Sequence, residues 1–338
     1  DNVLFTEYNE KEDLINTVIG SIAIRQKLER VTTKVDIGLE KTLYKNNQSL
    51  NDVNRSIMVD LGGALTERLS FSTSFSYRKE ALRGDDTDNT GLALIGDRTS
   101  FQVAMETTYA LTEISQILVS FAHSDSDRSQ DGRVERNKSH RLSLQYSHNL
   151  SEFWANSTGL ASLIYQNAES DEIDWSTETI EKYDTEIWQL TLGFSKALTE
   201  LFNFSLQGGV GYSQTRQALD QYAGFPPLFS ETESDSFNGV FSGEVNYGGE
   251  YLKASLSAYH DIRAGSGTNG AAERSSISLD LSRRMTDKLR LSLVTSCYLN
   301  QNERENQEDL DQLTLAIKPG FYYDMGDDFV LSGGYTYT

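Results

Sequence analysis

The acidic segment that begins at Asp86 has the residue types of a calcium-binding loop. Asp86 and Asp88 match the first and third ligand positions of such a loop, and Gly91 stands where the chain must turn sharply. Thr90 occupies the fifth ligand position, and Asp97 stands at the twelfth position in place of the usual bidentate glutamate. No helical pattern flanks the segment. We therefore expect a solvated loop, in which Asp86, Asp88, Thr90 and Asp97 are the candidate calcium ligands.

The other residues that could carry chemistry do not form a recognisable site. His123, His140, His148 and His260 are not spaced in the sequence as metal ligands, and Cys297 is the one cysteine. A hydrolase triad needs serine, histidine and an acid in a defined arrangement, and serine is so abundant here that an apparent match is a coincidence. Apart from the calcium candidate, the sequence predicts no metal, no cofactor and no enzymatic activity.

The composition excludes some partners and favours strands. The 338-residue chain carries 50 acidic and 30 basic residues, a net charge of −20, so nucleic acid is not an expected partner. No apolar run approaches the roughly 18 residues that a membrane helix needs. There are 17 tyrosines and 15 phenylalanines but only 3 prolines, which suits strands because proline cannot donate to a ladder.

A short turn motif recurs along the chain. It reads Leu-Thr-Glu-Arg at 65–68 and returns as Leu-Thr-Glu or Leu-Ser-Glu at 111–114, 150–153 and 198–201. Looser copies stand at 28–30, 248–250, 285–288 and 325–328. The first five starts are 37, 46, 39 and 48 residues apart. This spacing indicates a repeat architecture of hairpins.

Apolar and polar residues alternate on both sides of these turns. Leu69, Phe71, Phe75 and Tyr77, for example, are interleaved with serines. Each run holds for about 10–14 residues, the length of a tilted strand that crosses a bilayer. Since the polar face looks solvated, we expect the apolar face to meet lipid. The predicted lipid-facing residues are Phe71, Phe75, Tyr109, Trp188, Leu190, Phe204, Leu291 and Leu315.

The connections alternate between short turns and longer polar segments, which is typical of outer-membrane barrels. The longer segments are predicted as loops at about 45–51, 81–97, 126–135, 168–182, 215–235, 263–270 and 302–308. The sequence predicts an all-β transmembrane antiparallel up-and-down barrel of 16–18 strands, with short periplasmic turns and long extracellular loops. We expect it to be integral to the outer membrane of a Gram-negative bacterium. The sixteen predicted strands are 13–27, 31–44, 53–65, 68–80, 98–111, 114–125, 136–149, 153–166, 183–197, 201–214, 236–247, 250–262, 272–284, 288–300, 310–323 and 328–338.

The first predicted strand, 13–27, begins outside the cell and the last, 328–338, ends outside it, whereas a barrel normally begins and ends in the periplasm. We therefore expect residues 1–338 to be one barrel domain that lacks parts of the first and last strands of an 18-stranded parent. The chain opens without a leader pattern, so we expect that a leader was removed or that the sequence is part of a longer chain.

A barrel of this size leaves an aqueous channel. Charged residues on the predicted inner face can set ion selectivity, or they can be ordinary solvated residues. The apolar residues of loop 215–235 could form a constriction, contact a partner, or pack on the rim of their own loop. The predicted pore-lining residues are Lys34, Asp36, Glu40, Asp60, Glu106, Arg141, Glu244, Asp280, Arg284 and Lys318.

The N-terminal residues carry a family resemblance. The order of an Asp-Asn-Val-Leu-Phe segment at 1–5, an acidic stretch at 10–13 and a Leu-Ile…Thr-Val strand at 14–18 resembles the opening of outer-membrane β-barrel porins associated with exopolysaccharide. The chain departs from that pattern at Asn16, and at Ile19, where proline is usual. The resemblance implies a passive conduit that acts beside polysaccharide synthesis and export.

Three functions remain open from the sequence. The first is a channel for hydrophilic solutes, with exopolysaccharide as one possible cargo. The second is a structural barrel that docks or houses a partner, such as a component of a secretion or electron-transfer complex. The third is a soluble β-propeller, although its blades would need four short strands per repeat. The expected contacts are outer-membrane lipid, lipopolysaccharide, a hydrophilic cargo, and a periplasmic or outer-membrane partner protein.

Overall fold

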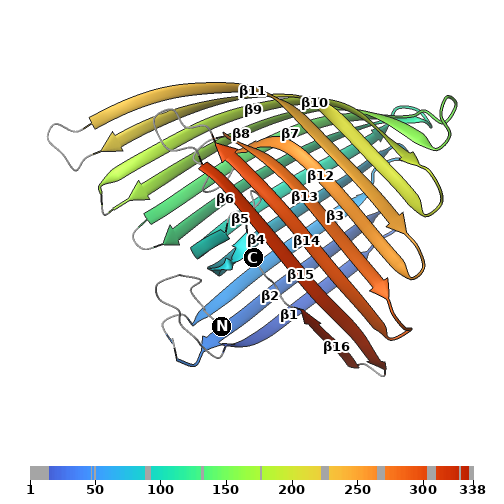
Figure 1. The fold of residues 1–338 in the computed structure, drawn as a ribbon, viewed down its shortest axis with the longest axis horizontal. Helices are drawn as coiled ribbons and strands as arrows, with labels where there is room; N and C mark the ends of the chain where they lie inside the picture. Colours follow the sequence, from blue (N-terminus) through green and yellow to red (C-terminus); the bar gives the residue numbers. More distant parts are fainter. Residues whose placement is uncertain are drawn as a thin grey trace.

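The computed structural model describes residues 15–46, 48, 51–87, 93–130, 133–175, 177–221, 228–264, 271–302, 310–326 and 329–334. Within these ranges no helix is long and apolar enough to cross a membrane. Sixteen antiparallel strands form one sheet, and each pairs with its neighbours in sequence order (Figure 1). The strands are β1 Ile15–Lys27, β2 Val31–Tyr44, β3 Asp52–Ala64, β4 Leu69–Thr87, β5 Ala93–Ala110, β6 Ser115–Gln130, β7 Arg133–Asn149, β8 Ser157–Asp174, β9 Thr179–Ala197, β10 Phe202–Gln221, β11 Leu228–Gly248, β12 Leu252–Ala264, β13 Ala271–Arg284, β14 Leu289–Asn302, β15 Leu310–Gly326 and β16 Phe329–Gly334.

The sheet curls into a barrel wall. Figure 1 shows β12–β15 crossing in front of β2–β6 with a different slope, as two walls of one barrel seen from the side. Over the described residues, no ladder joins β1 to β16. The order and direction of the strands confirm the predicted all-β, up-and-down architecture.

The recurring turn motif is explained by its hydrogen bonds. In the 65–68 turn, the hydroxyl of Thr66 accepts hydrogen bonds from the backbone N–H groups of Arg68 (3.2 Å) and Leu69 (3.0 Å). The carbonyl of Leu69 accepts from the N–H groups of Leu65 and Thr66. The same pattern recurs around Thr199 and Thr286. The threonine therefore caps the turn, which satisfies backbone groups that no strand pairs.

The opposite end of the barrel corrects several predicted loops. Segments 81–97, 126–135, 168–182 and 215–235, expected to be long loops, are mostly continuations of strands. Strand β10 runs to Gln221 and β11 begins at Leu228. The predicted strand 153–166 also begins later, at Ser157, because a turn occupies 151–156. Polar residues occupy both faces of these extensions, so apolar and polar residues no longer alternate and the sequence pattern underestimates the strands.

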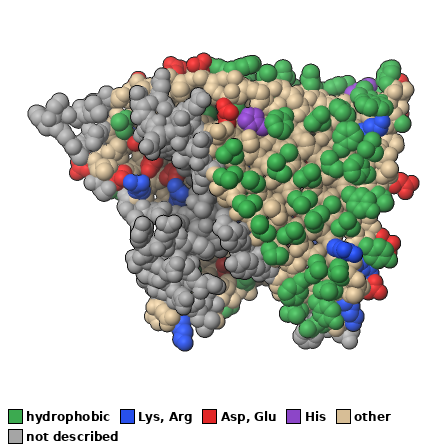
Figure 2. Space-filling view, in the orientation of Figure 1, with side chains coloured by type: hydrophobic (Ala, Val, Ile, Leu, Met, Phe, Trp, Pro, Cys, Tyr) green, Lys and Arg blue, Asp and Glu red, His purple; other side chains and the backbone are tan. Residues whose placement is uncertain are grey.

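The two faces of the sheet differ in polarity. We call the face that carries Trp188 and Leu190 the outer face, and the opposite face the inner face. These two side chains are 45% and 52% exposed, and Leu192 on the same face is 65% exposed. Figure 2 shows hydrophobic side chains spread over the front wall, with acidic and basic side chains at its margins. An apolar surface of this extent needs an apolar environment.

One hairpin leaves the wall and lies inside it. Strand β11 pairs with β10 from end to end, but with β12 only over Phe241–Gly248. Beyond His260, β12 stays paired with β13 and crosses to the inner face of β9 and β10. There the amide of Gln189 donates to the carbonyl of Ile262 (2.9 Å), and the N–H of Ala271 donates to the hydroxyl of Thr215 (3.3 Å). We call residues 261–264 and 271–274 the inward hairpin.

The contact between the inward hairpin and the wall is apolar. Ile262 is 2% exposed and packs against Ile187 (1%) and Val240 (4%) from the inner face of the wall. Burying an aliphatic side chain of this size contributes about 1.5–3 kcal/mol. Gly211 makes room for this contact, since a Cβ built there would lie 2.9 Å from Cδ1 of Ile262 and 3.1 Å from Cγ1 of Val240. The hairpin is thus held against the wall by packing as well as by hydrogen bonds.

Three glutamates face one another on the long extensions of the wall. Glu135, Glu172 and Glu181 are direct register partners across β7, β8 and β9. Glu172 lies about 15 residues above the short-turn end of β8, beyond the 9–11 residues that cross a bilayer. Burial, followed by the charges of Glu181 and Glu135, raises the pKa of Glu172, while Arg133 and Arg128 act in the opposite direction.

Substitution of Gly211 tests the packing of the inward hairpin against the wall. We expect Gly211→Leu to displace Ile262, because overpacking a filled contact costs about 1–3 kcal/mol. Hydrogen exchange of the amides of 261–264 and 271–274 should then accelerate roughly tenfold or more. Gly239→Leu is the matched control, since nothing lies within 4 Å of a Cβ built there. Equal exchange in the two variants would contradict the packing.

Substitution of Glu172 tests the acidic row. A raised pKa in the folded state stabilises the protein below the unfolded value, and this contribution is lost as the pH rises through the folded pKa. We expect Glu172→Gln to raise the melting temperature at pH 7 and to leave it unchanged at pH 4. Glu169→Gln, on the opposite face of the same strand, is the control. A shift of equal size at both pH values would argue against the carboxylate charge as the cause.

Candidate functional site

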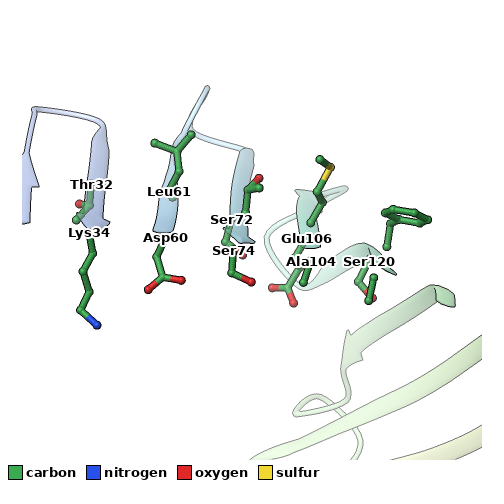
Figure 3. A pocket seen from close by; sticks show the side chains of 14 residues that line it. Thr32, Lys34, Asp60, Leu61, Ser72, Ser74, Ala104, Glu106 and Ser120 are labelled. Carbon is green, nitrogen blue, oxygen red and sulfur yellow. The ribbon is translucent and has the colours of Figure 1, made fainter. Parts of the chain in front are cut away.

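The inner face of β2–β6 carries a row of polar side chains. Lys34 is the register partner of Asp60, which is the partner of Ser74, and Glu106 lies between Ser72 and Ser120. In Figure 3, Lys34, Asp60, Ser74 and Glu106 point to the same side of the sheet, and Leu61 points to the other. A hollow of about 650 Å³ lies along this row. The hollow is shallow and open, so it is part of the wall and not an enclosed ligand pocket.

The ten predicted pore-lining residues share this face. Strand register connects Lys34 through β3–β6 to Arg141 on β7, and connects Glu244 through β12–β14 to Lys318 on β15. Asp36, Glu40, Asp280 and Arg284 have the same parity on their strands. Their common face is consistent with a charged lining. Their part in transport stays a prediction.

Several of these charges have close polar partners. The ammonium of Lys34 lies 2.5 Å from the carboxylate of Asp36, and the amide of Asn54 donates to Glu40 (3.3 Å). The guanidinium of Arg284 lies 2.6 Å from Asp287 in the neighbouring turn. Such exposed ion pairs contribute little stability, typically about 0–1 kcal/mol. The Lys34–Asp36 and Arg284–Asp287 pairs each neutralise a charge of the inner face.

Sequence reasoning missed the charged residues that the inward hairpin brings together. Asp261 and Arg263 on β12 and Arg274 on β13 lie on the hairpin side that faces away from the wall. Arg141 of β7 is exposed on the inner face, within electrostatic range of Arg263 and Asp261. Only the alternation of these residues was visible in the sequence. No local signal indicated that β12 would turn inward and approach β7.

The other candidate sites have mixed outcomes. The backbone of Asp86 lies in β4, and Asp97 lies in β5 opposite Ala81 and Ser129, so part of the proposed calcium loop is strand. Asp88 and Thr90 lie outside the described residues, and calcium binding there stays a prediction. No group of three metal-ligating side chains occurs in the described part of the chain. The apolar residues at 222–227 also lie outside the described residues.

The histidines are closer together than their sequence spacing suggested. His123 and His140 are register partners on the outer face of β6 and β7, and their rings stack with centroids 4.6 Å apart. Phe101 and Phe121 flank the pair. A separation of 17 residues in the sequence gave no signal of this contact, which depends on the register of the hairpin. The pair belongs to an aromatic row and, among the described residues, has no third ligand.

The predicted lipid-facing residues lie on the outer face. Tyr109, Trp188, Leu190, Leu291 and Leu315 are exposed there, and Phe71, Phe75 and Phe204 are partly exposed. Aromatic rings cluster at two levels of this face. Tyr165 packs on Trp188 at 4.4 Å towards the long-hairpin end, and Phe194 packs on Phe204 at 5.5 Å towards the short-turn end. Two aromatic levels that flank an apolar band are typical of membrane barrels.

Comparisons with known proteins find similarity in fold but not in sequence. No family model and no curated protein sequence matches the chain. The solved structures that it resembles include the alcaligin outer-membrane receptor FauA from Bordetella pertussis, with a TM-score of 0.53 and 12% identity over 96% of this chain and 59% of that one. The ferric-catecholate import receptor Fiu from Escherichia coli K12, in its open form, has a TM-score of 0.56 and 8% identity over 95% and 68% of the two chains. The ferric yersiniabactin uptake receptor FyuA from Yersinia pestis has a TM-score of 0.53 and 10% identity over 96% and 60%.

These similarities support the barrel and its location but not the finer family prediction. The chain spans less than two thirds of the length of FauA and FyuA. None of the three structures is described as a porin associated with exopolysaccharide, so that part of the resemblance lacks support. The sixteen-stranded up-and-down sheet, its apolar outer face and these structural neighbours together show an integral outer-membrane β-barrel.

Proposed function

We propose that this barrel carries a hydrophilic solute across the outer membrane through its lumen. The observation that supports this most directly is the separation of side chains by face. The outer face presents Leu, Phe, Tyr and Trp, whereas the inner face of β2–β6 presents Ser, Thr, Lys, Asp and Glu. A polar inner face is stable against water, and a barrel of this strand number is wide enough to enclose water. The ten predicted pore-lining residues are proposed to contact that water.

The assignment of faces is tested with two neighbouring residues of β7. We expect Leu144→Arg to destabilise the barrel by about 2–4 kcal/mol, because the charge would sit in lipid near the middle of the membrane. Gln145→Arg places the same charge on the inner face and should have a much smaller effect. Urea-dependent folding into lipid vesicles gives both free energies. A larger loss for Gln145→Arg would reverse the assignment of faces.

Passage through the lumen is tested by electrical recording. The purified barrel is reconstituted into planar lipid bilayers, and we expect discrete current steps with ions as the probe solutes. Heat-denatured protein from the same preparation is the control. Bilayers that stay sealed after verified insertion would contradict a passive channel. Sealed bilayers and a stoichiometric co-purifying protein would favour a barrel that docks a partner.

A second candidate is active uptake of an iron–siderophore complex. The observation that favours it is the similarity in fold to FauA, described as an alcaligin receptor, and to Fiu and FyuA, described as receptors for the import of ferric catecholate and the uptake of ferric yersiniabactin. Sequence identities of 8–12% do not carry a ligand from those proteins to this one. Saturable binding of a ferric siderophore by a barrel that does not conduct would favour this candidate. Export of exopolysaccharide rests on the N-terminal resemblance alone.

A further inference from the structure

The inward hairpin buries an arginine on the inner side of the barrel. Arg274 of β13 is only 4% exposed. Its guanidinium lies between two aromatic rings, 5.2 Å from the centroid of Tyr259 and 4.6 Å from that of Tyr298. One nitrogen, Nη2, donates to the hydroxyl of Tyr259 at 2.6 Å. The rings hold the guanidinium plane in place, and cation–π contact offsets part of the cost of its burial.

Five buried polar atoms of Arg274 and of two neighbouring side chains have no hydrogen-bond partner. Nε and Nη1 of Arg274, Oγ of Ser276, and both amide atoms of Asn300 are buried and unpaired. Asn300 is the register partner of Arg274 and is 1% exposed, and Ser276 is 4% exposed. Buried polar atoms are almost always paired in folded proteins, and a buried unpaired charge is the costliest exception. Nε and Nη1 of Arg274 and the amide nitrogen of Asn300 are donors, and the hydroxyl of Ser276 can also donate, so these atoms lack an acceptor, whereas the amide oxygen of Asn300 lacks a donor.

The local charge shows which kind of acceptor fits. Arg141, Arg263 and Arg274 bring three positive charges to this part of the lumen, and Asp261 brings one negative charge. One oxygen of the Asp261 carboxylate, Oδ2, bonds Nε of Arg263 at 2.6 Å. Its other oxygen, Oδ1, is buried without a partner, although Asp261 is the register partner of Arg274. Glu273, next in sequence to Arg274, lies on the other side of the hairpin, where the amide of Asn238 donates to it. In the described part of the chain, no carboxylate lies within 4 Å of the Arg274 guanidinium, although the protein has a net charge of −20.

We propose that Arg274, Ser276 and Asn300 form a binding site for an oxyanion, meaning a carboxylate, phosphate or sulfate group. Arg274 supplies charge and N–H donors, while the amide of Asn300 and the hydroxyl of Ser276 supply neutral donors. A water molecule would satisfy the amide and the hydroxyl, but it would not neutralise the guanidinium. Arg141, exposed on the inner face of β7 within electrostatic range of Arg263, attracts the anion towards the site. Entry of an anion would require the partly exposed Tyr298 ring, which packs on the guanidinium, to turn away from Arg274.

This inference deepens the proposed function by naming the class of solute, and it rests on that function only for the statement that the anion is cargo. Binding itself is measured in detergent micelles, without any passage through the lumen. A barrel that binds oxyanions but does not conduct would retain the site and refute the channel. A barrel that conducts but binds no oxyanion would retain the channel and refute the site.

Isothermal titration calorimetry at low ionic strength tests the site, with sodium phosphate, sulfate and acetate as separate probes and chloride as the reference anion. We expect saturable binding of at least one oxyanion to the wild-type barrel. Arg274→Gln should weaken it by roughly tenfold or more, since it removes a charge-assisted contact. Arg290→Gln is the matched control, because it removes an arginine from the inner face of β14 near the short turn. Its affinity should stay within about twofold of wild type.

Migration of unheated samples on a gel shows whether Arg274→Gln folds. If it does not fold, two further variants test the site. Asn300→Ala removes only neutral hydrogen-bonding atoms and should weaken binding. Arg141→Gln removes the exposed charge and should slow association more than it speeds dissociation. No saturable binding up to about 10 mM of each oxyanion, which corresponds to a very weak site, would overturn the proposal. Binding that is unchanged in both Arg274→Gln and Asn300→Ala would overturn it as well.

Discussion

The continuous backbone ladder is the constraint on which this structure depends. Lipid offers no hydrogen bonds, so each strand that crosses the membrane must pair its backbone with neighbouring strands. The ladder then sets the positions of the side chains, because successive residues point to opposite faces. Over sixteen strands in register, one face carries apolar side chains and the other polar ones. The lipid contact, the polar lumen and the aromatic levels all follow from that register.

The most unusual part of the fold is the place where two neighbouring strands stop pairing. Strand β12 leaves β11 after eight paired residues and keeps its ladder with β13, so the hairpin moves inward as a unit. Its former outer face, which includes Ile262, then packs on the inner face of β9–β11. The opposite face, with Asp261, Arg263 and Arg274, is turned towards the lumen. A single local separation thus provides an apolar contact on one side and a charged surface on the other.

The charge distribution of the lumen follows from this geometry. Along the inner face of β2–β6, charged residues lie among serines, and Lys34 pairs with Asp36. Around the inward hairpin, positive groups outnumber negative ones, and Arg274 is enclosed by Tyr259 and Tyr298. An electrostatic interaction is stronger where water is excluded than on a hydrated wall. Under the proposed function, the hairpin region is where the charge of a solute would be felt most strongly.

The sequence by itself determined the strand type, the strand order and the two faces, because these depend on local alternation and on turn residues such as Thr66 and Thr199. It also indicated the ten charged residues of the inner face, since parity along a strand can be read without knowing the rest of the fold. It could not indicate the long hairpin extensions, where polar residues occupy both faces and alternation carries little information. Only the tertiary structure decided that His123 meets His140, that Ile262 packs on Ile187, and that Arg274 is buried beside Asn300. These contacts depend on register between strands and on the point where β12 leaves β11, and both result from packing across distances that no local pattern encodes.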